Sequence, residues 1–231
     1  KDTDVIISMW PGDEEVLETV SNVKKNIKPN SVFVDMSSTK VSTANESYKA
    51  LKEINSHFID APVSGGPEGA KSGSLAIMAG GEQDIFLKIK PILETMGKST
   101  LLGRNGSGQV AKLCNQIIVN ITIGAVAEAI LLCEKNGTDP SKFITAVSGG
   151  FADSKILKIH GKRMIDKNFI AGGKNITLLK DMTNILDSAS EKNLNLPISK
   201  LIRNMFKNLC DAGLENDDHS SLYKEILKLS K

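Results

Sequence analysis

The sequence predicts an α/β domain with a mostly parallel sheet over residues 1–104, followed by an all-α domain over residues 105–231. Short runs rich in β-branched residues alternate with helical periods from residue 4 to residue 103, which is typical of repeated βαβ units. After Gly108 the strand signals are absent and helical periods follow one another. A length of 231 residues is sufficient for two modest domains of this kind.

The α/β half begins with a strand, expected at residues 5–9. Asp13 is the expected N-cap of a helix over residues 14–26. The later strands are expected at residues 31–35, 57–60, 75–79 and 100–102, and the later helices at residues 42–54 and 82–96. Gly97 follows the last helix and has the residue type expected at a helix C-cap.

The all-α half opens with a long apolar helix, expected over about residues 109–135. Shorter helices are expected at residues 140–148, 155–166, 176–191, 198–212 and 220–230, separated by turns rich in Gly, Asn and Pro. The long helix approaches membrane-spanning length, but Asn120, Gly124 and Glu128 interrupt its apolar run. We interpret it as a buried helix of a soluble protein, with the domain boundary near residues 103–106.

Composition and charge are those of an ordinary globular protein. The 40% hydrophobic and 24% charged residues argue against disorder and against a membrane bundle, and a net charge of +2 argues against nucleic acid as a partner. The three cysteines form no CxxC pair and the three histidines show no ligand spacing, so we expect neither a disulfide framework nor a metal site. No secretory signal is recognisable, and we expect a cytoplasmic protein.

The first motif that could support chemistry is DAPVSGG at residues 60–66. Ser64, Gly65 and Gly66 can present successive backbone N–H groups to an anion, and the Ser64 hydroxyl adds a donor. A substrate carboxylate could bind there, because ligands of α/β folds lie at the carboxyl edge of the sheet. The alternative is a tight turn without a ligand.

The second motif is GSGQVAKLCNQ at residues 106–116, at the start of the long helix. Lys112, Asn115 and Gln116 are spaced i, i+3 and i+4, so they share one helical face. The Lys112 ammonium could donate a proton to a carbonyl oxygen while Asn115 or Gln116 orients the substrate. The alternative is a lysine that extends to solvent beside amides that cap neighbouring loops.

A third motif, LLKD at residues 178–181, sets Lys180 and Asp181 in an apolar helix. Adjacent residues do not share a helical face, so the two are not a simple surface pair. Taken alone, an exposed charged stripe remains the default interpretation.

The α/β half lacks the expected opening of a nucleotide-binding sheet. Such sheets begin with a strand, a GxGxxG turn and a helix, whereas here the glycines of residues 103–108 follow the last expected strand. We therefore interpret the sequence as lacking the first βαβ unit.

In this order and at these separations, the three motifs together resemble the β-hydroxyacid dehydrogenase family. The resemblance covers essentially the whole chain. It implies a Rossmann-like dinucleotide-binding domain, here without its N-terminal βαβ unit, joined by the long central helix to an all-α domain. It also implies NAD or NADP as the cofactor and a small hydroxy or oxo acid as the substrate.

The resemblance assigns roles residue by residue. Lys112 matches the catalytic lysine, which protonates the carbonyl oxygen during reduction. Ser64, Gly65 and Gly66 match the carboxylate-binding loop, and Asn115 and Gln116 match substrate-orienting amides, although position 116 is often Asn in the family. The residues implied to contact the cofactor are Met9, Trp10, Pro11, Ser38, Lys180 and Asp181.

Further motifs, at residues 149–165 and 218–220, are similar to the branch that reduces tartronate semialdehyde to glycerate. Gly173 is a departure, because the family usually has Phe there, and a glycine removes an aromatic wall near the substrate. Oxidation of 3-hydroxyisobutyrate or another β-hydroxyacid therefore remains an alternative, as does a truncated, non-catalytic scaffold or dimerisation protein. The resemblance further implies a homo-oligomer, a dimer or tetramer assembled through the helical domain, and leaves the choice between NAD and NADP open.

Overall fold

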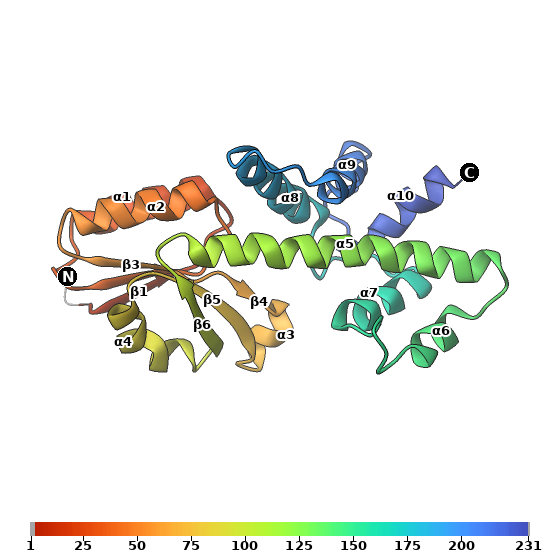
Figure 1. Cartoon of the computed structure of the whole chain (residues 1–231), viewed down its shortest axis with the longest axis horizontal. Helices are drawn as coiled ribbons and strands as arrows, with labels where there is room; N and C mark the ends of the chain where they lie inside the picture. The colour runs from red at the N-terminus through yellow and green to blue at the C-terminus, as the bar shows by residue number, and fades with distance from the viewer. Residues whose placement is uncertain (1–2, 231) are drawn as a thin grey trace. The chain divides into compact units, whose positions relative to one another are not determined.

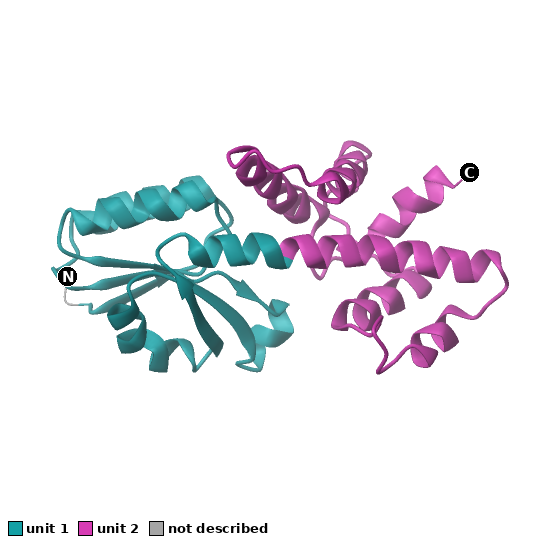
Figure 2. Cartoon of the chain, in the orientation of Figure 1, with its two compact units in different colours: residues 1–115 teal, residues 116–231 magenta. Residues whose placement is uncertain are grey.

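The computed structural model describes residues 3–230 (Figure 1). The chain divides into two compact units, Lys1–Asn115 and Gln116–Lys231. Figure 2 shows the boundary inside one long helix, α5 (Ser107–Lys135). The first turns of α5 therefore belong to unit 1 and the remainder to unit 2.

Unit 1 is built on a six-stranded mixed sheet. Its strands are β1 (Val5–Ser8), β2 (Val32–Asp35), β3 (His57–Asp60), β4 (Val63–Ser64), β5 (Leu75–Gly80) and β6 (Gly97–Gly103). β1, β2 and β3 are parallel neighbours, and β5 pairs with β6 in parallel. Both β3 and β4 pair with β5 in the antiparallel sense. The carboxyl ends of β1, β2 and β3 consequently lie at one edge of the sheet.

The helices of unit 1 cover both faces of this sheet (Figure 1). They are α1 (Asp13–Lys24), α2 (Val41–Lys52), the short α3 (Gly66–Lys71) and α4 (Gln83–Leu93). Because side chains alternate along a strand, Phe33 and Phe58 pack with α1 and α2, whereas Val34 and Ile59 pack with α4. The β-branched runs are hydrophobic on both sides because both sides are covered.

Two helix ends differ from the prediction. Gly12, rather than Asp13, is the N-cap of α1, and Asp13 instead accepts hydrogen bonds from the Lys40 N–H at 2.8 Å and the Thr43 hydroxyl at 2.6 Å. Gly97 is not a C-cap, since α4 ends at Leu93 and Gly97 opens β6. A Cβ on Gly97 would collide with the backbone of Leu75 in β5, so strand pairing is what requires this glycine.

Unit 2 is helical. Besides its part of α5 it contains α6 (Pro140–Ala146), α7 (Lys155–Ile165), α8 (Asn175–Ser190), α9 (Pro197–Asp211), the 3₁₀ turn η1 (His219–Ser221) and α10 (Leu222–Leu229). Its core includes Ile123 and Ile130 of α5 and Phe206 of α9, all fully buried. At Gly124 a Cβ would lie 2.7 Å from the Ile202 side chain, so α5 and α9 pack closely there.

Within the described residues, α5 is the helix whose length and composition would allow it to cross a membrane. Ile123, Val126 and Ile130 of that helix are buried inside the protein. Core helices of soluble proteins have the same length and composition.

Candidate active site

Lys112 lies next to the segment predicted to bind a carboxylate. Its Nζ donates a 2.8 Å hydrogen bond to the carbonyl oxygen of Val63, 49 residues earlier in the chain. Val63 and Ser64 form the short strand β4, which the sequence prediction did not include. The structure of unit 1 thus brings the predicted proton donor to the residue that precedes Ser64.

The backbone of Ser64, Gly65 and Gly66 turns sharply between β4 and α3. Gly65 has φ 140° and Gly66 has φ 64°, values in the left-handed region that side chains rarely adopt. Gly65 is the N-cap of α3, a helix that the prediction treated as loop. The two glycines are therefore required by the backbone itself, and Ser64 supplies the side-chain hydroxyl of this segment.

The start of α5 is fixed by a buried carboxyl group. Asp60, at the carboxyl end of β3, accepts hydrogen bonds from the Gly106 N–H at 2.8 Å and the Gln109 N–H at 3.0 Å. Burial raises the pKa of Asp60 to about 6, although these N–H groups lower it in part. Gly80 and Gly108 border the same carboxyl, and a Cβ on either would lie 2.8 Å from its oxygens.

A second network joins the loops that follow β1 and β2. The Ser8 and Ser37 hydroxyls donate to Asp35 Oδ1 at 3.0 and 2.6 Å, and the Trp10 N–H donates to the Ser37 hydroxyl at 2.7 Å. Burial raises the pKa of Asp35. The loop that contains Met9, Trp10 and Pro11 is therefore held beside the turn that contains Ser38.

Gln109 connects that turn to α5. Its side-chain Nε2 donates to the Ser37 carbonyl oxygen at 2.8 Å, and its Oε1 accepts from the Thr39 N–H at 3.1 Å. These partners flank Ser38 on both sides. Within unit 1, the buried Gln109 side chain thus links the turn that contains Ser38 to the first turn of α5, the helix that also contains Lys112.

In unit 2, the predicted residues Gln116, Lys180 and Asp181 form a polar group of their own. Gln116 Nε2 donates a 2.6 Å hydrogen bond to Asp181 Oδ2, and Lys180 Nζ lies 3.9 Å from Asp181 Oδ1. Gln116 and Asp181 are both buried. A buried amide paired with a buried carboxylate is not an exposed charged stripe.

Gly173 lies against the imidazole of His219. A Cβ on Gly173 would lie 2.6 Å from His219 Nε2 and still closer to Cε1, so the ring occupies the space that a side chain at position 173 needs. Burial lowers the pKa of His219 to about 4, which keeps the ring neutral at pH 7. The His219 ring therefore fills the space beside position 173, and this chain has glycine there instead of Phe.

Asp218 organises the loop around Gly173. Its Oδ2 accepts hydrogen bonds from the N–H groups of Gly172 at 2.9 Å and Gly173 at 3.3 Å, and its Oδ1 accepts one from the Ser220 hydroxyl at 2.6 Å. His160 and Arg163 approach to 3.6 and 3.4 Å. Burial alone would raise the pKa of Asp218, but these partners hold it well below its usual range.

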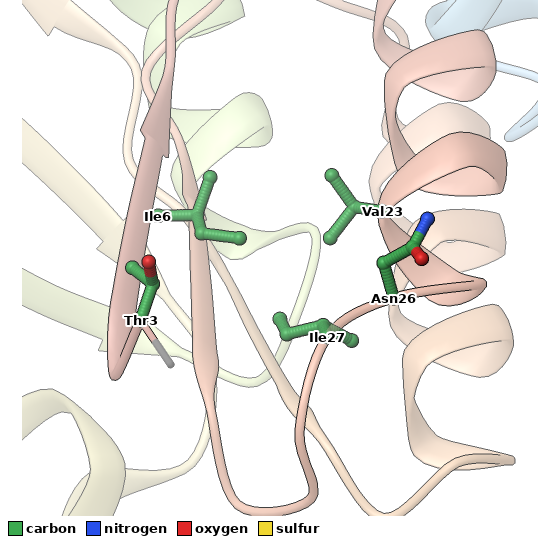
Figure 3. A pocket seen from close by; sticks show the side chains of 5 residues that line it. All are labelled: Thr3, Ile6, Val23, Asn26 and Ile27. Carbon is green, nitrogen blue, oxygen red and sulfur yellow. The ribbon is translucent and has the colours of Figure 1, made fainter. Parts of the chain in front are cut away.

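A surface hollow lies elsewhere in unit 1 (Figure 3). It is lined by Thr3, Ile6, Val23, Asn26 and Ile27, from the start of β1 and the end of α1. Figure 3 shows Ile6 and Val23 on facing elements. None of the site residues predicted from the sequence lines this hollow.

Sequence reasoning missed the polar residues that hold the site in place. These residues are Asp60, Asp35 and Gln109. Each lies in a predicted strand or motif, but their hydrogen-bond partners include residues distant in the chain. A helix N-terminus favours a carboxylate, so the Gly-rich start of α5 was a signal for an acidic partner, although it did not identify Asp60. The described residues contain no group of three or more His, Cys, Asp or Glu placed to hold a metal ion.

Two protein families match the chain. The NAD binding domain of 6-phosphogluconate dehydrogenase matches residues 1–134. The NAD-binding domain of NADP-dependent 3-hydroxyisobutyrate dehydrogenase matches residues 106–226. Together the two matches include both units.

Individual relatives agree with these matches. The chain is 40% identical to 2-hydroxy-3-oxopropionate reductase of Escherichia coli over 97% of its own length and 78% of that protein. It is 32% identical to mitochondrial 3-hydroxyisobutyrate dehydrogenase of Mus musculus, over 96% of the chain and 70% of that protein. The solved structure of Mycobacterium tuberculosis 3-hydroxyisobutyrate dehydrogenase with L-serine superimposes with a TM-score of 0.89 at 26% identity, covering 97% of this chain and 80% of that one.

Proposed function

The chain belongs to the β-hydroxyacid dehydrogenase family of NAD(P)-dependent oxidoreductases, and from this membership we propose that it reduces tartronate semialdehyde to glycerate. The observation that supports the proposal most directly is the hydrogen bond from Lys112 Nζ to the Val63 carbonyl oxygen, beside Ser64. It holds an ammonium group next to the segment proposed to bind the substrate carboxylate. The 40% identity to a 2-hydroxy-3-oxopropionate reductase supports this substrate over others of the family.

The proposed chemistry needs one proton and one hydride. Bound NADH or NADPH supplies the hydride to the aldehyde carbon. Lys112 donates its proton to the aldehyde oxygen as negative charge develops there, and the resulting amine recovers a proton from solvent. Ser64, Gly65 and Gly66 bind the substrate carboxylate, and Asn115 and Gln116 orient the substrate.

The residues at the carboxyl ends of β1 and β2 fit a dinucleotide cofactor. Trp10 and Met9 are exposed there and offer apolar surface for a planar ring. The Thr39 hydroxyl is buried with no hydrogen-bond partner among the described residues, as expected where a polar ligand completes the site. We assign cofactor contact to Met9, Trp10, Pro11 and Ser38, and in unit 2 to Lys180 and Asp181.

The test is the oxidation of NADH and of NADPH by the full-length gene product with tartronate semialdehyde as substrate. Lys112→Ala should lower kcat by at least about a hundredfold, because general acid catalysis of this kind contributes about 10²–10⁴. Val110→Ala, an exposed position on the same helix, should leave kcat unchanged and serves as the matched control. Equal rates in Lys112→Ala and wild type would contradict the assignment.

The competing substrate is 3-hydroxyisobutyrate, which the 32% identity to a 3-hydroxyisobutyrate dehydrogenase favours. This substrate carries a methyl group where tartronate semialdehyde carries a hydroxyl. Comparing kcat/KM for the NAD(P)-dependent oxidation of glycerate and of 3-hydroxyisobutyrate in the same preparation decides between them, and a preference for 3-hydroxyisobutyrate would overturn the reductase assignment. Absence of turnover on either substrate by protein that binds NAD(P)H would point to the non-catalytic scaffold.

The remaining proposals concern assembly and location. We propose a homo-oligomer through unit 2, supported by the exposed apolar residues Ile118 and Leu132 of α5 and Leu201 of α9. Analytical ultracentrifugation measures the oligomeric state, and a monomer would contradict this proposal. We also propose domain limits of 1–104 and 105–231 and a cytoplasmic location.

A further inference from the structure

Gln109 has contacts that the proposed chemistry does not use. Its side chain is 0% exposed, in the first turn of α5, and it makes hydrogen bonds to the Ser37 carbonyl oxygen and the Thr39 N–H. The side chain therefore binds the turn that contains Ser38 on both sides, since it donates to Ser37 and accepts from Thr39. An uncharged amide of this length offers both at once.

The main chain of the same residue is also fixed. The Gln109 N–H donates to Asp60 Oδ2 at 3.0 Å, while the Gly106 N–H donates to Asp60 Oδ1 at 2.8 Å. Asp60 is itself fully buried at the end of β3. If the turn that contains Ser38 shifts and Gln109 shifts with it, the start of α5 must therefore move as well.

Lys112 follows three residues later on α5, so it lies on nearly the same helical face as Gln109. Its Nζ is held at the Val63 carbonyl oxygen, at 2.8 Å. A displacement of the first turn of α5 relative to β2 would therefore move the ammonium relative to Ser38. All of these contacts lie within unit 1.

We infer that Gln109 is a positioning residue that sets the distance between the cofactor-contacting turn at Ser38 and the proton donor Lys112. The inference rests on the proposed function. It assigns to one buried amide an effect on both cofactor binding and proton transfer, although Gln109 itself touches neither cofactor nor substrate.

Two nearly isosteric substitutions test it in the full-length gene product. Gln109→Met keeps the volume and removes both hydrogen bonds, and Gln109→Glu keeps the acceptor but, when ionised, faces the Ser37 carbonyl oxygen with a negative charge. Val110→Ala, at the next and exposed position, is the control. The measurements are the Kd of NADH from its fluorescence, the single-turnover rate at saturating NADH, and Tm.

We expect Gln109→Met to weaken NADH binding about tenfold and to slow the saturated single turnover about tenfold, since two buried partners lose their hydrogen bonds. Position 109 is fully buried, so burial should raise the pKa of the introduced carboxyl well above its ordinary value. Gln109→Glu should therefore show the same defects at pH 8 and recover toward wild type at pH 6, because a protonated carboxyl group restores the donor to Ser37. Wild type and Val110→Ala, titrated in parallel, give the reference at each pH.

A lower Tm with unchanged Kd and turnover in the folded variants would mean that Gln109 only packs, and would overturn the inference. A Gln109→Glu variant without recovery at pH 6 would do the same. NADH binding by wild type without turnover would overturn the proposed substrate alone, because the binding comparison still tests Gln109. Failure of wild type to bind either NADH or NADPH would overturn both.

Discussion

The Asp60 carboxyl is fully buried, yet it contacts two backbone N–H groups at the start of α5 rather than a cation. The N–H groups favour the ionised form and burial favours the neutral form. Burial has the larger effect, because the pKa of Asp60 is raised from 3.8 to about 6. A residue that positions α5 therefore titrates close to neutral pH.

This pKa predicts a specific dependence of stability on pH. Between pH 4 and pH 6 the folded protein retains a proton on Asp60 that the unfolded chain releases, so the stabilisation from this proton is present at low pH and lost as pH rises through 6. The unfolding free energy of wild type relative to Asp60→Asn should fall by about 2 kcal/mol between pH 4 and pH 7. Urea titrations at both pH values measure it.

Asp84→Asn, an exposed carboxylate in the same unit, is the matched control and should show no such difference. Parallel pH dependence in wild type and Asp60→Asn would mean that Asp60 keeps an ordinary pKa in the folded protein.

At the scale of elements, α5 contains two glycines in different surroundings. A Cβ on Gly108 would collide with the Met78 carbonyl oxygen and lie 2.7 Å from the Asp60 carbonyl oxygen, both of them backbone atoms. A Cβ on Gly124 would lie 2.7 Å from the end of the Ile202 side chain and in ordinary contact with the Leu222 side chain, at 3.8 Å. The first contact requires the sheet or the helix to shift, whereas the second requires only a rotamer change.

Gly108→Ala should therefore lower the unfolding free energy by about 3 kcal/mol or more, because backbone overpacking exceeds the gain of about 1 kcal/mol in helix propensity. Gly124→Ala, in the same helix, should change it by less than about 1 kcal/mol, because the same gain offsets a smaller strain. Equilibrium unfolding of the two variants in parallel measures the contrast. Similar losses in both would contradict the distinction between backbone and side-chain neighbours.

For the whole molecule, buried ionisable groups in the two units act in opposite directions. Asp60 in unit 1 stabilises at low pH, as described above. His219 in unit 2 has its pKa lowered by burial to about 4, so its stabilisation is present above about pH 6.5 and is lost as pH falls. The pKa of Asp218 is held low by its partners, so its stabilisation is lost as pH falls below about 4. Between pH 4 and 6.5, the contributions of Asp60 and His219 to the unfolding free energy therefore change in opposite directions with pH and offset each other.

Removing the charge of Asp218 should destabilise the protein strongly at neutral pH. Asp218→Asn leaves the half-buried Arg163 and His160 without the buried carboxylate that they contact, and we expect a loss of about 3 kcal/mol at pH 7 that shrinks below pH 4. Asp166→Asn breaks only the surface pair with Lys162 at 2.8 Å and should cost about 0.5 kcal/mol or less. Thermal unfolding at pH 7 and pH 3.5 compares the two, and equal losses would contradict a buried role for Asp218.

Local sequence patterns predicted the fold class, the order of the strands and helices apart from β4 and α3, and the motifs that contain Lys112, Ser64 and Lys180. These follow from local information, because hydrophobic periodicity and turn residues act over a few positions along the chain. The prediction missed β4, α3 and the roles of Asp13 and Gly97. These features depend on contacts with other elements.

Only the tertiary structure decided which polar atoms meet. Lys112 reaches Val63 across 49 residues and Gln109 reaches Ser37 across 72, and neither separation has a sequence signature. Each pair forms because the sheet register and the start of α5, fixed by Asp60, bring the strand ends to one edge, where a buried polar group must find a partner. Periodicity shows which side of an element is buried, whereas the partner of a buried polar group depends on how the elements pack.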